Sequence, residues 1–368
     1  MKNPKVSIIA SSFNTSAEYL LACVDSIINQ TFEDFEFFIV DDCSVTNKVE
    51  DVLKNVKDKR IKIIKNEQNQ GLAVSLNKCI MFSKGQYIVR MDTDDIAMQD
   101  RLERQIKYMD DNPLCDIMSG RTCLFTDSGK FWIGSTYYGD SRSVNIELFF
   151  DSTLLHPSII IRKSFLEKNN LFYDPECRRA QDYNLWVRSS LVGGDIRSVE
   201  DYYIFYRQHE NAASKKDRGG QIKVILDIHK QYLEKLAIDW NSKTEKIHEC
   251  FCNPYEYDSY DVKSMVKWAK YLIKMNTKAK FFKTKDFQYG VIKRLLGGIQ
   301  LQYAAGHVSL KDMFYVGGNM LIHISWFITT LRIVWTKRKQ KKKEQEHYLK
   351  YIKEEWERVQ DKYLISKK

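Results

Sequence analysis

The sequence predicts an α/β protein: a mainly parallel sheet with flanking helices, followed by an all-helical C-terminal region. Strand and helix patterns alternate through the first hundred residues. Helical segments of about 10 to 15 residues between strands imply right-handed crossovers and a mainly parallel sheet. From residue 219 onward the hydrophobic periodicity is helical almost throughout.

The N-terminal half is built from short apolar stretches separated by amphipathic ones. The apolar stretches predict strands at 5–13, 35–42, 61–66 and 86–92. The periodic segments predict helices at 15–32, 45–57, 71–84 and 99–113. Thr15 and Glu18 have the spacing of a capping box at the start of the first helix, and Pro113 ends the last one.

The pattern is less regular between residue 113 and the helical region. We expect strands at 116–125, 131–138 and 202–209, and an amphipathic helix over 178–194 that ends at two glycines. Leu185, Trp186 and Leu191 are its expected core contacts. A Lys/Gly-rich stretch near Lys215 predicts a boundary, which divides the chain into a domain at 1–215 and a helical region at 216–368.

The charge distribution argues against nucleic-acid binding. The 368 residues carry a formal net charge of +10, but the segment 337–368 holds 12 Lys/Arg against 6 Asp/Glu. The body of the chain is therefore nearly balanced, and the excess lies in a basic tail. An apolar stretch at 313–335 precedes that tail, and we interpret it as an interfacial membrane helix, with a buried helix or a true span as alternatives.

The cysteines and the N-terminus favour a cytoplasmic protein, which the interfacial helix and the basic tail would hold on the inner face of the plasma membrane. The eight cysteines are scattered and show no zinc-site spacing, so we expect reduced thiols. The N-terminal apolar run is short and interrupted by serines, which is typical of a first strand and not of a signal peptide.

Carboxylates crowd the end of the fourth predicted strand in "MDTDD". Ligands bind outside the carboxyl ends of strands in such sheets. Asp92 and Asp94 would offer hard oxygen ligands to Mg²⁺ or Mn²⁺, which compensates their mutual repulsion. The alternative is a solvated acidic turn in which Asp95 or Asp100 caps the helix at 99–111.

Two other strand ends also carry polar or aromatic residues suited to a nucleotide. Asp41 and Asp42 follow "FFIV" and could accept hydrogen bonds from a base and ribose, or form an Asx-type turn. Phe13 could stack on a nucleobase or be an ordinary core aromatic. No GxGxxG follows the first strand and no GxxxxGK[ST] occurs, which excludes dinucleotide oxidoreductases and P-loop proteins.

Taken in order, a series of motifs resembles the family 2 glycosyltransferases of the GT-A fold. The motifs are "PKVSIIASSFN", "FIVDDCS", "NQGLAVSLNKCI", "GQYIVRMDTDDI", "RLERQ", "HPSIIIRKSF", "AQDYNLWVR" and "YRQHENAAS". They cover about 1–215. The resemblance implies an inverting transferase that moves a sugar from a nucleotide diphosphate sugar, with a UDP-sugar favoured, to an acceptor hydroxyl.

The same resemblance assigns roles to individual residues. Phe13 would stack on the base, Asp42 would accept from the base edge, and Asp92 would approach the ribose or a metal-bound water. Asp94 would be the principal ligand of Mn²⁺ or Mg²⁺. Asp182 would be the base that deprotonates the acceptor.

Three positions, His209, His156 and Asp182, each have a functional and a structural interpretation. His209 is a candidate for a further metal or diphosphate contact, or a strand-end histidine bonded to backbone. His156 would have a structural role or line the acceptor side. Gln181 stands where the family has an acidic residue. Asp182, taken alone, also reads as a carboxylate stabilised by the helix N-terminus.

The chain lacks a QxxRW motif and a series of strong membrane spans, which processive members of the family tend to carry, so we expect a non-processive enzyme that adds one sugar at a time. The resemblance implies a metal-dependent hexosyl- or N-acetylhexosaminyltransferase. The implied acceptor is a lipid-linked saccharide for a bacterial surface polysaccharide, such as capsule or lipopolysaccharide. One alternative is a nucleotide-sugar-binding or scaffold protein that has lost catalysis. Phosphatases of the haloacid-dehalogenase type also use D-x-D. Their motif typically lies near the start of the chain, and Thr or Val stands at the position that Ile96 occupies here.

Overall fold

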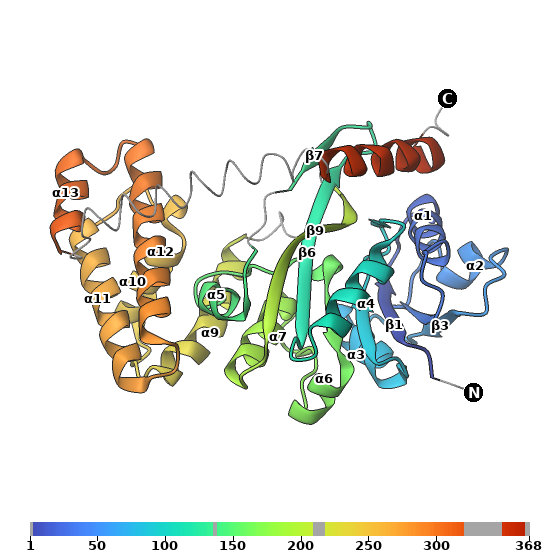
Figure 1. Ribbon diagram of the computed structural model, residues 1–368, viewed down its shortest axis with the longest axis horizontal. Coiled ribbons are helices and arrows are strands. Elements are labelled where there is room, and N and C mark those ends of the chain that lie inside the picture. The colour runs from blue at the N-terminus through green and yellow to red at the C-terminus, as the bar shows by residue number, and fades with distance from the viewer. Residues whose placement is uncertain (1–2, 135–137, 209–217, 320–347, 365–368) are drawn as a thin grey trace. The chain divides into compact units, whose positions relative to one another are not determined.

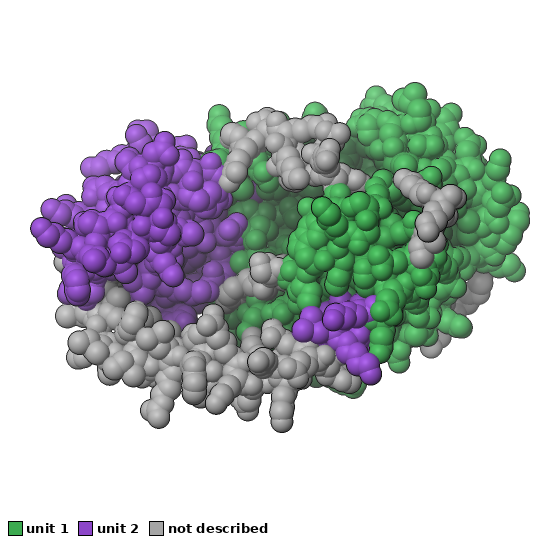
Figure 2. All heavy atoms as spheres, turned by 90° about the horizontal axis from the view of Figure 1, so that it is seen from above, with its two compact units in different colours: residues 1–145, 152–225, 354–368 green, residues 146–151, 226–353 purple. Residues whose placement is uncertain are grey.

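A computed structural model of the chain describes residues 3–134, 138–208, 218–319 and 348–364. The chain forms two compact units, which Figure 2 colours separately. The first unit contains residues 1–145, 152–225 and 354–368, and the second contains 146–151 and 226–353. This division differs from a single boundary near Lys215, because the end of the chain returns to the first unit.

The first unit is organised by one mixed sheet with the order β3-β2-β1-β4-β8-β6-β9-β5, in which β7 pairs with β6 (Figure 1). The strands are β1 (Val6–Ser12), β2 (Phe35–Asp41), β3 (Ile61–Lys65), β4 (Tyr87–Arg90), β5 (Ile96–Ala97), β6 (Ile117–Phe125), β7 (Phe131–Ile133), β8 (Ile160–Arg162) and β9 (Ile196–Arg207). The first four strands are parallel, as predicted. Strand β8 runs antiparallel to both β4 and β6, so the sheet is mixed beyond that point.

The helices of the first unit include one for each of the five predicted there. They are α1 (Ala17–Ile28), α2 (Val49–Leu53), α3 (Leu72–Phe82), α4 (Arg101–Asp111), α5 (Ser141–Glu147), α6 (Lys163–Asn169), α7 (Gln181–Leu191) and the start of α9 (Arg218–Lys235), with a 3₁₀ turn η1 (His156–Ser158). Of these, α5 and α6 were not predicted. The predicted capping box is wrong: Ser16 is the N-cap of α1 and accepts from the Tyr19 N–H. Leu191 is only half-buried, whereas Leu185 and Trp186 are in the core as expected.

Several predicted bounds are also wrong. The helix expected at 45–57 is reduced to α2, and the strand expected at 131–138 is described only as β7. The last strand begins at Ile196, six residues earlier than predicted, because its pairing with β6 overrides its polar local sequence.

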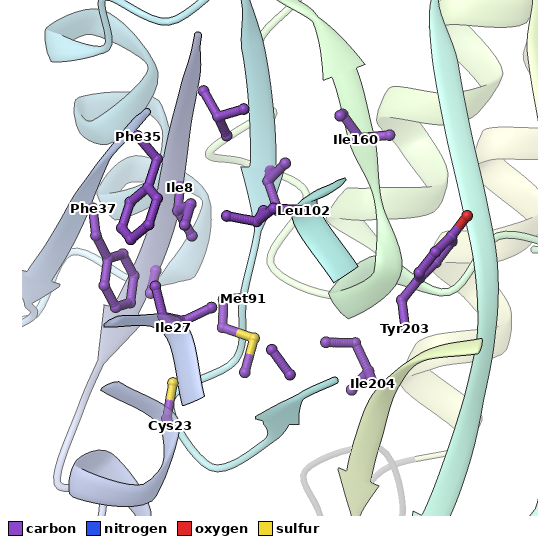
Figure 3. Packing of buried hydrophobic residues seen from close by; sticks show 14 of the residues in the cluster. Ile8, Cys23, Ile27, Phe35, Phe37, Met91, Leu102, Ile160, Tyr203 and Ile204 are labelled. Carbon is purple, nitrogen blue, oxygen red and sulfur yellow. The ribbon is translucent and has the colours of Figure 1, made fainter. Parts of the chain in front are cut away.

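The core of the first unit lies between the sheet and α1 and α4. Figure 3 shows Ile8, Phe35 and Phe37 from β1 and β2 pointing toward Ile27 of α1. These side chains are at most 4% exposed. Burial of a large apolar side chain stabilises a fold by about 1.5 to 3 kcal/mol. The packing therefore fixes the positions at which β1, β2 and β4 end.

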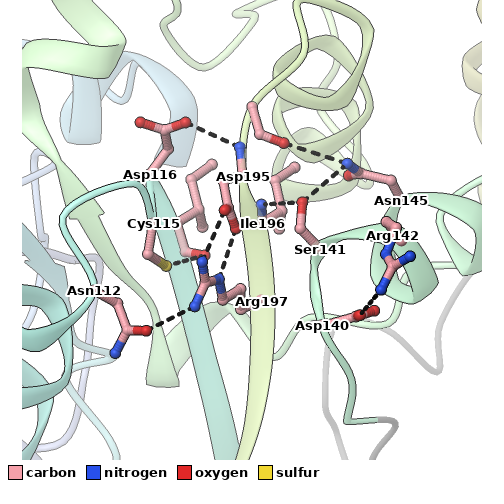
Figure 4. Close-up of polar contacts among 12 residues, drawn as sticks. Asn112, Cys115, Asp116, Asp140, Ser141, Arg142, Asn145, Asp195, Ile196 and Arg197 are labelled. Carbon is pink, nitrogen blue, oxygen red and sulfur yellow. Dashed lines mark hydrogen bonds and ion pairs between the residues drawn. The ribbon is translucent and has the colours of Figure 1, made fainter.

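A polar network holds the first residues of β9 (Figure 4). Arg197 pairs with Asp195 at 2.7 Å and donates to the Asn112 side chain at 2.8 Å. Asp195 donates its backbone N–H to Asp116 at 2.9 Å, and Ser141 accepts from the Ile196 N–H at 3.2 Å. These contacts fix the register of the strand whose other end reaches the carboxylates of "MDTDD".

The second unit is helical. Its helices are the greater part of α9, α10 (Ser242–Cys252), a 3₁₀ turn η2 (Pro254–Glu256), α11 (Val262–Ala279), α12 (Thr284–Ala304) and α13 (Leu310–Asn319). Asn241 and Thr244 form a capping box at the start of α10, and Asp261 caps α11. Phe149 packs in this core against Tyr232, His248 and Phe287.

The C-terminal segment belongs to the first unit from Glu354 onward. Residues 348–359 are helical and continue into a short π-helical turn η3 (Gln360–Leu364). Trp356 stacks on Phe131 at 5.1 Å and contacts Phe125 and Phe205 at 5.4 and 5.6 Å. The Tyr363 hydroxyl donates to Asp25 of α1 at 2.6 Å.

The predicted membrane segment lies largely outside the described residues, which end at Asn319 and resume at 348. Among the helices that are described, none is long and apolar enough to cross a bilayer.

Candidate functional site

The carboxyl ends of β1 and β4 meet at one edge of the sheet. Thr15, just after β1, forms a hydrogen bond of 2.9 Å with Thr93, just after β4. The Cys23 thiol of α1 donates to the Asp92 carbonyl at 3.3 Å. These contacts fix the backbone of "MDTDD" against the end of β1.

Asp92, Asp94 and Asp95 form one carboxylate cluster, whose ligand atoms lie within 4.8 Å of one another. Asp95 is 1% exposed; its Oδ1 accepts from the Arg207 N–H at 2.9 Å, while its Oδ2 has no hydrogen-bond partner within the described part of the chain. Burial raises the pKa of Asp95 well above its ordinary value, and Asp94 and Asp92 raise it further. The three carboxylates therefore repel one another, and a bound cation would relieve that repulsion.

The acidic-turn alternative does not describe this loop. Asp100 is the N-cap residue of α4, but its side chain makes no capping hydrogen bond. Asp95 faces Arg207 of β9 and does not cap the helix. The interpretation of Asp95 as only a turn residue is therefore too narrow, because the structure places it with the other two carboxylates.

Arg90, the last residue of β4, is a buried cation beside this cluster that the sequence patterns did not reveal. It is 4% exposed and forms an ion pair with Asp92. Its Nε has no hydrogen-bond partner among the described residues. Arg101 supports it by donating to the carbonyl oxygens of Arg90 and Pro157, both at 2.8 Å.

Asp182 lies in the first turn of α7, and its carboxylate interacts electrostatically with Arg90 and Asp92. Burial raises its pKa above the ordinary value, the Tyr183 backbone N–H and Arg90 lower it, and Asp92 raises it. The residue before the helix, Ala180, has φ 54° and ψ 31°, a left-handed conformation that costs an alanine roughly 1 to 2 kcal/mol. This turn sets the direction in which α7 starts.

His156 of η1 is also part of the surroundings of Arg90. It is 8% exposed, and its Nε2 is 2.8 Å from the Tyr173 hydroxyl. Burial lowers the pKa of His156 well below its ordinary value, and Arg90 lowers it further. The ring is therefore neutral, and its bond to Tyr173 is consistent with the structural role predicted for it.

Asp41 and Asp42 separate into two different roles. Asp41 accepts a hydrogen bond from the Ser44 N–H at 2.8 Å, as a side chain that stabilises a turn does. Asp42 is 3% exposed, and its carboxylate accepts from the Asn66 side chain at 2.6 Å and from the Gln70 and Gly71 N–H groups at 2.8 Å. Since an ionised carboxylate offers about four acceptor positions, Asp42 retains about one for a ligand.

Phe13 is placed differently from a core aromatic. Its side chain is 51% exposed after the end of β1, so a flat ligand has access to it. A cavity of about 270 Å³ lies by the Asp42-bound loop. It is lined by Gln70, Gly71 and Gln181, with Asn69, Leu72, Ala73, Pro175, Cys177 and Arg178. Gly71 adopts φ 85°, which glycine reaches without strain.

Arg207, the last residue of β9, is a second residue that sequence reasoning missed. Its backbone N–H binds Asp95, its Nε donates to the Asp94 carbonyl at 2.8 Å, and its guanidinium pairs with Asp127. It also lies 4.0 Å from the Tyr19 ring centroid. His209, two residues further, is outside the described residues, so its predicted contact stays a prediction.

The carboxylate cluster fits a hard divalent cation. Carboxylate oxygens are the protein ligands that Mg²⁺ and Mn²⁺ prefer. The buried and unpartnered Oδ2 of Asp95 is the structural observation that such an ion would satisfy.

Comparison with known proteins agrees with this arrangement. Residues 7–179 match the family model described as "Glycosyl transferase family 2". An uncharacterized glycosyltransferase of Methanocaldococcus jannaschii is 34% identical over 212 residues, which are 56% of this chain and 72% of that protein. The chain belongs to glycosyl transferase family 2.

Two further relatives have more specific names. The putative teichuronic acid biosynthesis glycosyltransferase TuaG of Bacillus subtilis is 34% identical over 57% of this chain and 82% of its own. The O-antigen biosynthesis glycosyltransferase WbnJ of Escherichia coli is 30% identical over 54% of this chain and 78% of its own. These matches cover little more than half of this chain.

Solved structures show the fold over a longer part of the chain. TarS 1–349 of S. aureus in complex with UDP-GlcNAc has a TM-score of 0.55 and 16% identity, and the match covers 82% of this chain and 92% of that one. The complex of the same protein with UDP has a TM-score of 0.52. The predicted GT-A fold with a helical C-terminal region is thereby confirmed.

Proposed function

We propose that this protein is an inverting, non-processive glycosyltransferase that moves one sugar from a UDP-sugar to an acceptor hydroxyl. The observation that carries the proposal is the carboxylate cluster at the strand ends, together with a buried Asp182 whose pKa responds to the charges of Arg90 and Asp92. A single displacement with inversion needs a base on the acceptor side and charge neutralisation on the leaving side. It does not need a protein nucleophile.

In the proposed reaction, Asp182 accepts the proton of the acceptor hydroxyl. The acceptor oxygen then bonds to the anomeric carbon as the bond to the diphosphate breaks. Phe13 offers a face for the base, and the remaining acceptor position of Asp42 can take a hydrogen bond from it. Asp92, Asp94 and Asp95 would hold Mn²⁺ or Mg²⁺, which supplies charge neutralisation for the diphosphate when bound.

The substrate class is inferred from the relatives. TuaG and WbnJ are named for teichuronic acid and O-antigen biosynthesis, and TarS is solved with UDP-GlcNAc. We therefore propose an N-acetylhexosaminyl or hexosyl donor and a lipid-linked saccharide acceptor in surface polysaccharide synthesis. Such an acceptor would place the enzyme at the cytoplasmic membrane face.

The test is the melting temperature of the full chain with UDP-GlcNAc and UDP, with and without Mn²⁺. At a hundredfold excess over Kd, a ligand bound by the native state should raise the melting temperature by about 5 °C. Asp94→Asn should lose the Mn²⁺-dependent part of the shift. Asp111→Asn, which changes an exposed carboxylate at the end of α4, should keep it.

Transfer itself is measured as UDP release with a panel of saccharide acceptors. Acceptor-dependent release would exclude the alternative of a binding protein that has lost catalysis. Binding of UDP-GlcNAc with equal affinity in the presence of a chelator would contradict the metal assignment. Absence of any nucleotide-dependent shift would contradict the donor class.

A further inference from the structure

A strongly basic run crosses the middle of the second unit. Residues 263–285 contain eight lysines and no Asp, Glu or Arg. The preceding residues 226–262 contain four lysines and eight Asp or Glu. The basic charge is thus concentrated in α11 and the turn into α12, and it is independent of the basic segment after residue 336.

Five of these lysines lie on one face of α11, which we call the lysine face. They follow one another at spacings of four, three, four and four residues: Lys263, Lys267, Lys270, Lys274 and Lys278. All five are exposed. The opposite face of α11 is buried through Met265, Trp268 and Leu272. A helix with this division presents one fixed cationic surface to solvent.

Helix α13 packs against α11 and carries exposed apolar side chains. Leu310 is 58%, Met313 40% and Phe314 80% exposed. The Ser309 hydroxyl lowers the pKa of Asp312, and Lys263 of the lysine face lowers it further. The start of α13 therefore lies near the start of α11. Basic residues beside exposed apolar ones are typical of proteins that lie on anionic bilayers.

We propose that the lysine face of α11 binds the anionic phospholipid surface of a membrane. It spans about 22 Å, from Lys263 to Lys278 at about 1.5 Å per residue. Lysine is a flexible point charge, which suits a fluid array of headgroups, whereas recognition of a defined phosphate or carboxylate favours the planar fork of arginine. No arginine is present in this run.

The inference rests on the proposed function in one respect: a lipid-linked acceptor would be held at the same surface that α11 contacts. The lipid binding itself requires neither donor nor metal. It can therefore be measured separately from sugar transfer.

The experiment is co-sedimentation of the full chain with vesicles of phosphatidylcholine alone or with about 30% phosphatidylglycerol. The variant Lys267→Glu/Lys274→Glu/Lys278→Glu reverses three charges of the lysine face. Since each lysine near an anionic surface contributes about 1 kcal/mol, its affinity for the anionic vesicles should fall at least tenfold. Binding of the wild type should weaken as salt is raised.

The matched control is Lys54→Glu/Lys57→Glu/Lys59→Glu, which makes the same change of net charge on exposed lysines of the first unit. It should bind the vesicles within about twofold of wild type. Both variants should keep the melting temperature and the UDP-dependent shift, so a failure of donor binding cannot be mistaken for a failure of lipid binding.

Equal vesicle binding by the two triple variants would overturn the proposal. So would lysine-dependent binding of polygalacturonate in solution with no preference for anionic vesicles, which would assign the lysine face to an acidic polysaccharide.

Discussion

The two units bury ionisable groups in opposite ways. The first unit buries charged side chains at the edge of its sheet, among them Arg90, Asp95 and Arg101, which are at most 4% exposed. Among the described residues of the second unit, the buried polar side chains are His229, His248, Asn276 and Gln302. Burial lowers the pKa of His248 to about 3, so that its ring is neutral. Buried charge is thus concentrated where the proposed chemistry occurs.

His229 and His248 of the second unit lie with Cys252 in a group that resembles a metal site, since their ligand atoms are within 4.8 Å of one another. The hydrogen bonds indicate packing instead. Trp268 donates its Nε1–H to Nδ1 of His248 at 3.3 Å. The neutral ring then carries its proton on Nε2, which lies 3.5 Å from the Cys252 sulfur. A metal would have to displace that proton, so we assign no metal to this group.

The largest expected effect tests whether the buried charge of the first unit serves catalysis. Asp182→Asn should lower kcat by about 10² to 10⁴-fold and leave the affinity for UDP-sugar unchanged, because a general base acts only on the acceptor proton. Turnover and calorimetry measure the two quantities. Asp111→Asn is the control, and activity within threefold of wild type in Asp182→Asn would refute the base assignment.

Asp182→Asn, which is expected to lower activity, should nevertheless stabilise the fold. Because the pKa of Asp182 is raised in the folded state, the folded protein holds the carboxyl proton more tightly than the unfolded chain does. The fold is therefore destabilised as the pH rises above the pKa that Asp182 has in the unfolded chain. Asp182→Asn removes that penalty. In the absence of metal its melting temperature should equal or exceed that of wild type at pH 7, and the difference should vanish near pH 4.

A second prediction compares a buried with a surface cation. Arg90→Gln leaves Asp92, whose side chain is 29% exposed, without its buried ion-pair partner and should lower the free energy of unfolding by about 2 to 3 kcal/mol. Arg142→Gln removes a pair with Asp140 in which both side chains are about 60% exposed, and should cost less than about 1 kcal/mol. Urea denaturation measures both. Equal costs would show that Arg90 is not electrostatically special.

The smallest expected effect concerns the second unit at acid pH. A histidine whose folded pKa is depressed stabilises the fold above its unfolded pKa, about 6.5, and that stability is lost as the pH falls toward the folded pKa. Between pH 7 and 5, wild type should therefore lose about 2 kcal/mol more than His248→Gln. Hydrogen exchange in α10 and α11 measures the local loss, with β1 and β2 as the internal control. Equal losses in both proteins would contradict the burial of a neutral His248.

The sequence predicted those features that depend on local patterns. The strands β1 to β4 and the positions of Phe13 and the "MDTDD" acids follow from hydrophobic periodicity and strand ends. It did not reveal Arg90 or Arg207, because a lone arginine next to an apolar strand carries no local signal of burial. Their importance arises from pairing: Arg207 reaches Asp95 only because β9 pairs with β5.

The cap of α1 and the start of β9 were predicted wrongly because both depend on contacts between residues distant in sequence. Ser16 displaces Thr15 as the cap because Thr15 bonds to Ser12 and Thr93 across the sheet edge. The start of β9 depends on contacts of Asp195 and Arg197 with Asp116 and Asn112, which are distant from them in sequence. Neither choice is encoded in a window of neighbouring residues.

The return of the chain to the first unit decides how the protein can be shortened. A truncation after residue 308 would remove the apolar stretch at 313–335 together with Trp356 and Tyr363, and would leave the aromatic surface around Phe131 exposed to water. An internal deletion within 320–347, joined by a flexible linker, would retain that aromatic contact. Such a deletion would separate the contribution of the intervening basic segment from the integrity of the catalytic domain.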